Sequence, residues 1–202
     1  MSLIKNFCFF FLFSCYANAA DLYKFDPNHT NINWSVSHFG FSNVSGKFIA
    51  AEEKIIGKIL IDEANPKNSS IEVEVKIDAL STGISKFDNH LKSADFFDIE
   101  KFPTATFISK SVVLKDKNRA EVFGDLTLCG VTKSVALEVK MNKIGTGLMT
   151  QRKTIGFSAT AKIKRSQFGM LFGLPGVSDE VKLQIEAEII LLDDAQKKLL
   201  DR

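Results

Sequence analysis

Residues 70–79 read SIEVEVKIDA, and their alternation decides the fold class. Charged side chains alternate with apolar ones, and the apolar positions are Ile71, Val73, Val75, Ile77 and Ala79. A period of two is typical of a β-strand that buries one face. Because the opposite face is charged, we expect an antiparallel sheet that is wet on one side, not a parallel sheet covered by helices.

The same alternation recurs along the chain. It is clear at residues 30–39 (TNINWSVSHF), 134–141 (SVALEVKM), 156–165 (GFSATAKIKR) and 181–189 (VKLQIEAEI). Weaker strands are expected at residues 45–50, 55–62, 105–114 and 120–128. The total is eight or nine strands, which fits either a sandwich or a closed barrel.

Residues 88–107 interrupt the strand pattern. They begin DNHLKSADFF, in which Asp88 is a candidate N-cap and Leu91, Ala94 and Phe97 have helical spacing. Pro103 then prevents a helix from continuing. We therefore predict a short helix between two strands, with the aromatic rings of this segment facing what lies beneath it.

The chain begins with MSLIKNFCFFFLFSCYANA, which has a positive start at Lys5, a short apolar core and small residues at Ala17 and Ala19. This pattern predicts a secretory signal peptide over residues 1–19, with cleavage after Ala19. The alternative is a lipoprotein signal, in which Cys15 becomes the lipidated N-terminus. Either interpretation predicts export.

Composition narrows the classes of partner. Without the leader, the 26 basic residues lose Lys5, which leaves 25 against 24 acidic residues, and no basic run stands out. This balance argues against a nucleic-acid partner. Cys129 is then the one remaining cysteine, so no intramolecular disulfide is expected. It is either a buried free thiol or the link of a homodimer.

No catalytic or metal-binding motif stands out in the sequence. The histidines His29, His38 and His90 are not paired at metal-ligand spacing, and there is no G-x-S-x-G elbow. His38 continues the apolar side of its strand, which suits a structural histidine, a contact for a ligand head group or a metal ligand. His90 is either structural or a ligand contact. We expect no enzyme activity, no cofactor and no metal site.

Several motifs occur in a fixed order. They are residues 23–48 (YKFDPNHTNINWSVSHFGFSNVSGKF), 81–83 (STG), 89–107 (NHLKSADFFDIEKFPTATF), 124–139 (GDLTLCGVTKSVALEV), 156–170 (GFSATAKIKRSQFGM) and 177–188 (VSDEVKLQIEAE). In these motifs the chain resembles the YceI-like polyisoprenoid-binding family of exported bacterial proteins. It departs from that family at Cys129, where histidine is common, at Ser134, where proline is common, and at Gln167, where aspartate is usual.

The resemblance implies an all-β fold, a single antiparallel lipocalin-like barrel of about eight strands with a short helix at one mouth. The barrel would cover residues 20–190 and leave a polar tail at residues 191–202. It also implies a periplasmic protein that holds an isoprenoid or similar long-chain lipid in its lumen and makes at most transient membrane contact. The ligand-binding residues would be Trp34, Val36, His38, Phe48, Val75, His90, Leu91, Phe96, Phe97, Phe107, Phe157, Ala159, Ala161, Phe168 and Met170.

Two features of this expected barrel have alternative interpretations. Small inward residues, such as Gly46, Ala159 and Ala161, would keep the lumen open for one slim chain, or they only ease the curvature of the strands. Phe96 and Phe97 would form a lid at the mouth, or a plug without a ligand role. The leading prediction is a carrier or buffer for a polyisoprenoid or a quinone-like lipid. The alternatives are an enzyme that acts on such a lipid, and a structural or stress-protective protein with an incidental cavity.

Overall fold

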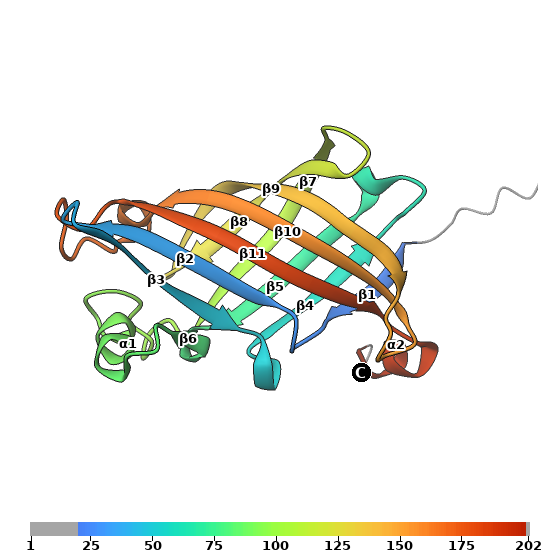
Figure 1. Ribbon diagram of the computed structural model, residues 1–202, viewed down its shortest axis with the longest axis horizontal. Coiled ribbons are helices and arrows are strands. Elements are labelled where there is room, and N and C mark those ends of the chain that lie inside the picture. Colours follow the sequence, from blue (N-terminus) through green and yellow to red (C-terminus); the bar gives the residue numbers. More distant parts are fainter. Residues whose placement is uncertain (1–19, 201–202) are drawn as a thin grey trace, which may run out of the picture.

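The computed structural model describes residues 20–200, except for the side chains of residue 52 and residues 198–200. The expected leader, with its cleavage site and the alternative lipidated Cys15, lies outside this part of the chain. Strands of the described part form one antiparallel sheet (Figure 1): β1 (Asp21–Phe25), β2 (Asn31–His38), β3 (Ser42–Ile49), β4 (Ile55–Ile61), β5 (Ser70–Lys76), β6 (Leu80–Ser81), β7 (Thr104–Leu114), β8 (Arg119–Leu128), β9 (Val131–Thr146), β10 (Lys153–Lys164) and β11 (Glu180–Leu191).

Eight of these strands close into a ring. The neighbours run β1-β4-β5-β7-β8-β9-β10-β11, and the pairing of β1 with β11, with Tyr23 opposite Leu191, completes the circle. Closure leaves no free edge among these strands, so their backbone groups are paired within the protein. The expected barrel of about eight antiparallel strands is therefore confirmed, and the sandwich alternative is wrong.

The other three strands extend one end of the barrel. β11 pairs with β1 through residues 189–191 and with β2 through residues 182–186, so β1 and β2 lie one after the other along the same neighbour. β3 pairs with β2 along its length, and the short β6 pairs with β3. β1 and β6 were not predicted because strands of five and two residues are too short to show alternation.

Strand β5 ends earlier than its alternation suggests. Ile77 and Ala79 continue the apolar pattern, yet they form the 3-10 turn η3 (Ile77–Ala79), in which both are buried. The backbone N–H of Ile77 donates to the carbonyl of Pro103 instead of extending the ladder. The turn lets the chain cross to β3 and form β6 there, so the prediction of a strand through Ala79 is wrong.

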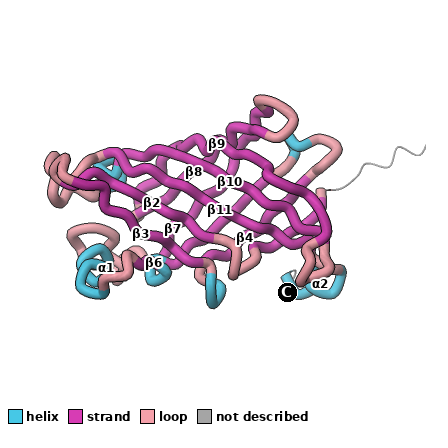
Figure 2. Tube along the Cα trace, viewed as in Figure 1, coloured by secondary structure: helices cyan, strands magenta, loops and turns pink. Residues whose placement is uncertain are grey.

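Helices are few, and they lie at the ends of the barrel. Figure 2 shows the helices α1 (Ser85–Lys92) and α2 (Asp194–Leu200) at opposite ends. Three further 3-10 turns are η1 (Ala51–Glu53), η2 (Pro66–Asn68) and η4 (Arg165–Phe168). Helix α2 lies within the segment that was expected to be a polar tail. Among residues 20–200, no helix has both the length and the apolar character that crossing a bilayer requires.

The predicted helix is present, but its N-cap is wrong. Ile84 is the N-cap of α1, and Asp88 lies inside the helix. The Asp88 carboxylate accepts hydrogen bonds from the backbone N–H of Thr82 at 2.7 Å and from its hydroxyl at 2.6 Å. It therefore holds the turn that leads into the helix. Because α1 ends at Lys92, Leu91 is its buried residue, while Ala94 and Phe97 lie beyond it.

Two buried clusters fill the two ends of the barrel. The mouth cluster lies at the α1 end and includes Trp34, Phe48, Leu91, Phe168 and Met170, each at most 8 % exposed. The base cluster lies at the α2 end and consists of Tyr23, Ile59, Ile155 and Ile189, each at most 4 % exposed. Because these residues come from strands far apart in the sequence, the clusters hold the ring together from inside.

Candidate ligand-binding lumen and mouth

The middle of the barrel is lined by inward side chains that belong to neither end. Directly paired residues of antiparallel strands point to the same face. Ala159 on β10 pairs with Val139 on β9 and with Ile185 on β11. On the next pair of strands, Val122 lies opposite Leu137. These residues form an apolar belt between the mouth cluster and the base cluster.

Several side chains of this belt are less buried than those at the base of the barrel. Val122, Leu137, Val139 and Ile185 point inward and are apolar, yet each is only partly buried. By contrast, Ile155 on the same face of β10 is fully buried in the base cluster. A close-packed interior would bury all of them alike. The middle of the barrel is therefore less tightly packed than its base. The interior of an eight-stranded barrel is just wide enough for side chains or for one small ligand.

Small residues lie in the belt at two of the three expected positions. Ala159 and Ala161 lie on the lumen face, 7 % and 8 % exposed. Gly46 has a different role, because a Cβ atom there would lie only 2.5 Å from Cζ2 of Trp34. The indole ring occupies the room that this glycine leaves. The expectation that Gly46 opens a channel is wrong, and its small size serves the packing of Trp34.

The segment after α1 covers the mouth. Phe97 makes an edge-to-face contact with Phe48 of β3, with ring centroids 5.8 Å apart. Phe96 lies nearer the rim, where its ring contacts those of His90 and Phe172 at 5.1 and 5.5 Å. Both side chains thus pack against the mouth cluster, and Phe96 also contacts residues of the rim.

Cys129 fixes this segment from the neighbouring β8–β9 turn. Its thiol donates weak hydrogen bonds to the carbonyls of Phe96 and Phe97, at 3.6 and 3.7 Å. Burial, and then the charge of Asp98, raises the pKa of the Cys129 thiol to about 11. Thiolate is therefore scarce at neutral pH, and the reactive form that disulfide exchange needs is disfavoured. Cys129 is a half-buried free thiol in the structure.

Arg165 organises a neighbouring loop at the mouth, whose Phe172 contacts the rings of His90 and Phe96. This residue of η4 is 3 % exposed. Its guanidinium donates four hydrogen bonds of 2.8–2.9 Å, all to backbone carbonyls, and the acceptors are Met170, Phe172, Val177 and Ser178. Four of its five N–H donors are thereby engaged by carbonyls of its own loop.

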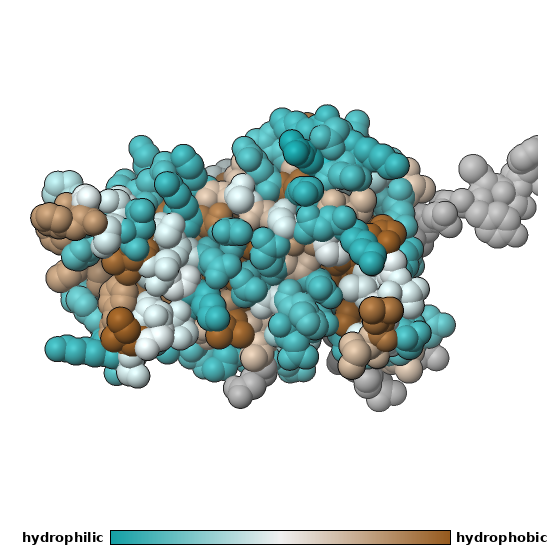
Figure 3. Space-filling view, in the orientation of Figure 1, coloured by the Kyte–Doolittle hydropathy of each residue, from teal (hydrophilic) through white to brown (hydrophobic). Residues whose placement is uncertain are grey.

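Large apolar side chains are exposed around the same mouth. They form a rim patch of Phe39, Phe41, Ile84, Leu171 and Phe172, which are 50–92 % exposed. Figure 3 shows apolar surface at the end of the barrel where the β2–β3 turn lies. The members come from that turn, from the start of α1 and from the loop after η4. An exposed apolar cluster of this kind marks an interaction surface.

The structure distributes the predicted ligand-binding residues along the barrel. Those at or against the mouth cluster are Trp34, Val36, Phe48, Val75, Leu91, Phe96, Phe97, Phe168 and Met170. Ala159 and Ala161 lie in the middle, Phe157 packs against the base cluster, and Phe107 is buried on β7. His38 and His90 are exposed at the rim. His38, which was expected to continue the apolar face of its strand, lies at the exposed end of β2.

A groove of about 580 Å³ lies outside the lumen. Most of its lining side chains alternate with lumen residues and point outward, including Glu138, Thr160, Lys162 and Lys182. Trp34, Ala161 and Leu183, whose side chains belong to the inner face, also line the groove.

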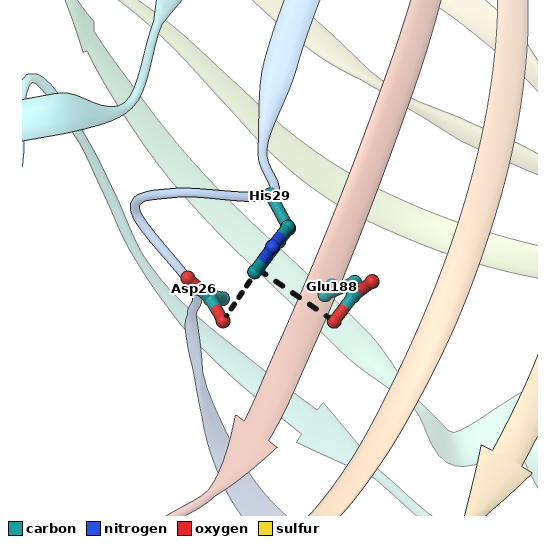
Figure 4. A group of neighbouring side chains, drawn as sticks. All are labelled: Asp26, His29 and Glu188. Atoms are coloured by element: carbon teal, nitrogen blue, oxygen red, sulfur yellow. Dashed lines mark hydrogen bonds and ion pairs between the residues drawn. The ribbon is translucent and has the colours of Figure 1, made fainter. Parts of the chain in front are cut away.

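A polar cluster on the outer surface was missed by the sequence analysis (Figure 4). His29 Nδ1 lies 3.0 Å from Oδ2 of Asp26 and 3.9 Å from Oε2 of Glu188. Hydrogen bonding to Asp26 and its charge raise the pKa of His29, with a smaller contribution from Glu188. Burial acts to raise the pKa of Asp26, but hydrogen bonds from His29 and Asn28 outweigh it and hold that pKa below its ordinary value.

Comparison with known proteins agrees with this architecture. The family model of the YceI-like domain matches residues 23–189. The chain belongs to the YceI-like family. Protein YceI of Escherichia coli O157:H7 is 38 % identical over 180 residues, which cover 88 % of this chain and 91 % of the relative.

Solved structures share this barrel. The YceI protein of Campylobacter jejuni is 31 % identical, with a TM-score of 0.69, over 78 % of this chain and 90 % of that one. A polyisoprenoid binding domain from Saccharophagus degradans, implicated in plant cell wall breakdown, has a TM-score of 0.64 and covers 87 % of this chain and all of its own. At 13 % identity, that second likeness shows the fold alone.

Proposed function

We propose that this YceI-like protein is an exported carrier or buffer that holds a polyisoprenoid or quinone-like lipid in its barrel. The observation that carries the proposal is the partly exposed apolar belt between two dry clusters. A chain of linked methyl-branched units fits such a space, because it is slim and offers apolar surface along its whole length. A polyisoprenoid binding domain from Saccharophagus degradans has the same fold.

The belt suits binding rather than chemistry. Its inward positions hold alanine, valine, leucine and isoleucine, namely Ala120, Val122, Leu137, Val139, Ala159, Ala161, Ile185 and Ala187. None of these side chains can accept or donate a proton, so none of them can act as a general acid or a general base. Removing apolar ligand surface from water stabilises the complex by about 25 cal/mol per Å² before ordering costs.

The segment around Phe96 and Phe97 serves as the lid of this site. Phe97 packs on Phe48 inside the mouth, whereas Phe96 packs on rim residues. A lipid that enters at this end has to pass these two rings. Lid opening therefore controls the rate of exchange more than the affinity of the closed complex.

The rim patch gives the protein a surface for brief contact with a bilayer. Phe41 is 92 % exposed at the tip of the β2–β3 turn, beside the proposed entrance. Aromatic side chains at such a position insert at the boundary between head groups and acyl chains. Insertion of one loop tip is weak and reversible, which suits a carrier that has to leave the membrane after loading.

A pair of tryptophan substitutions tests the proposal. Ala159→Trp places a large ring in the belt, while Thr160→Trp places the same ring on the exposed outer face of the same strand. Overpacking costs about 1–3 kcal/mol, which a domain of this size can survive. Lipid bound to each protein, purified from its own host, is measured by native mass spectrometry.

The wild-type protein and Thr160→Trp should carry a lipid, and Ala159→Trp should not. Circular dichroism and a denaturation midpoint establish that Ala159→Trp is folded. If the folded Ala159→Trp protein carries as much lipid as wild type, the ligand does not occupy the belt and the proposal is wrong. Chemical conversion of the bound lipid during incubation would instead support an enzyme.

A further inference from the structure

We propose that Asp26, His29 and Glu188 form a binding site for one divalent transition-metal ion of the Zn²⁺ class. The site lies outside the barrel, away from the proposed lipid lumen, and it is independent of the proposed function. Its three residues offer one imidazole nitrogen and two carboxylate oxygens, all within 4.8 Å of one another. Figure 4 shows the three side chains converging on one point from two segments of the chain.

The distances between the donor atoms suit a tetrahedral ion. With metal–ligand bonds of about 2.0–2.1 Å, two donors at a tetrahedral site lie about 3.4 Å apart. The two distances from His29 Nδ1, 3.0 Å to Asp26 and 3.9 Å to Glu188, lie on either side of this value. The side chain of Glu188 is 46 % exposed, so it can rotate to close the longer one.

The backbone already holds the three residues together. The N–H of Asp26 donates to the carbonyl of Glu188 at 2.8 Å, and the N–H of Glu188 donates to the carbonyl of His29 at 3.3 Å. The N–H of His29 donates to the carbonyl of Asp26, also at 3.3 Å. Binding an ion therefore requires little ordering of the main chain, and such preorganisation favours binding.

A backbone hydrogen bond from outside the site also orients the Asp26 carboxylate. The N–H of Asn28 donates to Oδ1 of Asp26 at 2.9 Å. That bond leaves Oδ2 for the metal and orients the carboxylate, as outer-shell partners do in metal sites. The Asp26 side chain is 11 % exposed and the His29 side chain 58 %, so the site is anchored on one side and open to solvent on the other.

The donor set selects the class of ion. Mg²⁺ and Ca²⁺ prefer sets made only of oxygen, whereas imidazole with carboxylates suits Zn²⁺ and its neighbours. Three protein ligands with an open side leave room for water at the fourth position. The ion would join the turn between β1 and β2 to β11, since Glu188 lies on β11 between the residues that pair with β1 and with β2.

The chain offers its own control for a metal titration. His90 Nε2 lies 3.0 Å from Asp95 Oδ2, the same distance as in the proposed site, but the described residues place no third metal-binding side chain there. Zn²⁺ binding to the tag-free exported protein is measured by competition with a chromophoric chelator. The variants are Glu188→Gln, His29→Gln and, as the control, His90→Gln.

Wild type and His90→Gln should bind one Zn²⁺ with the same affinity. Glu188→Gln and His29→Gln should each bind at least about tenfold more weakly, because even the loss of an outer-shell partner typically costs 10–100-fold. A crystal soaked in Zn²⁺ should show anomalous scattering between the three residues. No stoichiometric binding by wild type, or binding that both site variants leave unchanged, would overturn the proposal. Thermal denaturation shows that each variant is folded.

Discussion

Replacing Arg165 by lysine should destabilise the protein strongly although the charge is kept. The guanidinium reaches four carbonyls spread over residues 170–178, at 2.8–2.9 Å, from three nitrogen atoms. The single nitrogen of lysine can serve one or two of them. At least two hydrogen bonds to a charged group are therefore lost, each worth about 1.5–3 kcal/mol.

Because water can replace some of the lost donors, we use the lower end of this range of hydrogen-bond energies. Only the bond to Met170 is wholly buried, and the other carbonyls are part-buried, so solvent can replace some of the lost donors. We therefore expect the free energy of unfolding to fall by about 3 kcal/mol. For a domain of this size, the melting temperature would fall by about 6–12 °C.

The assay is urea denaturation followed by circular dichroism and by the fluorescence of Trp34, the single tryptophan of the chain. Arg119→Lys is the control, because the Arg119 side chain is 68 % exposed and lies 3.9 Å from its partner Asp116. That control should stay within about 0.5 kcal/mol of wild type. If Arg165→Lys also stays within about 0.5 kcal/mol, the guanidinium does not hold the mouth loop together.

Three other predictions concern the lid, acid stability and export. Replacing Phe96 and Phe97 together by serine should speed the transfer of a fluorescent isoprenoid to acceptor vesicles. An unchanged transfer rate with a much lower denaturation midpoint would show that the two rings only pack in the core and do not form a lid. The pKa of Asp179 is held below its ordinary value of 3.8, chiefly by the backbone N–H of Ser166 and then by the Ser166 hydroxyl and the charge of Arg165. The Asp179 carboxylate therefore stabilises the fold at pH values above 3.8, and this contribution is lost as the pH falls through the lower pKa of the folded state. Asp179→Asn should be less stable than wild type at pH 7. Unfolding curves from pH 7 to pH 2 should show the difference in stability between the two proteins closing only at the acid end. N-terminal sequencing of the exported protein should give Ala20, and a diacylated Cys15 would contradict this.

The alternation of apolar and polar residues predicted most strands of the barrel, because it depends only on the local sequence. The alternation that marks β5, β10 and β11 needs only a buried face and a wet face, and both can be recognised from side-chain type. The same rule failed at Ile77, which is buried and in phase but lies in a turn. Its backbone N–H bonds to Pro103, and no periodicity reveals that partner.

The candidate sites were predictable to different degrees. Ala159 and Ala161 could be placed on a lumen face because their strand alternates strictly. The roles of Gly46 and Arg165 could not, since they depend on what fills the space beside a glycine and on which carbonyls a guanidinium meets. Glu188 joins His29 only because β1 and β2 both lie along β11, a tertiary pairing that leaves no trace in the local sequence.

The pairing of β11 with both β1 and β2 also determines when the barrel can close. β1 pairs with β4 and β2 with β3 early in the chain, but the ring stays open until β11, the last strand, arrives between β10 and the N-terminal strands. Such contacts between distant parts of the chain make folding slow. A chain with this order stays open while it is being made. Passage through a narrow translocation channel requires an unfolded chain, so this strand order suits the export that we propose, because the ring cannot close before β11 has been made.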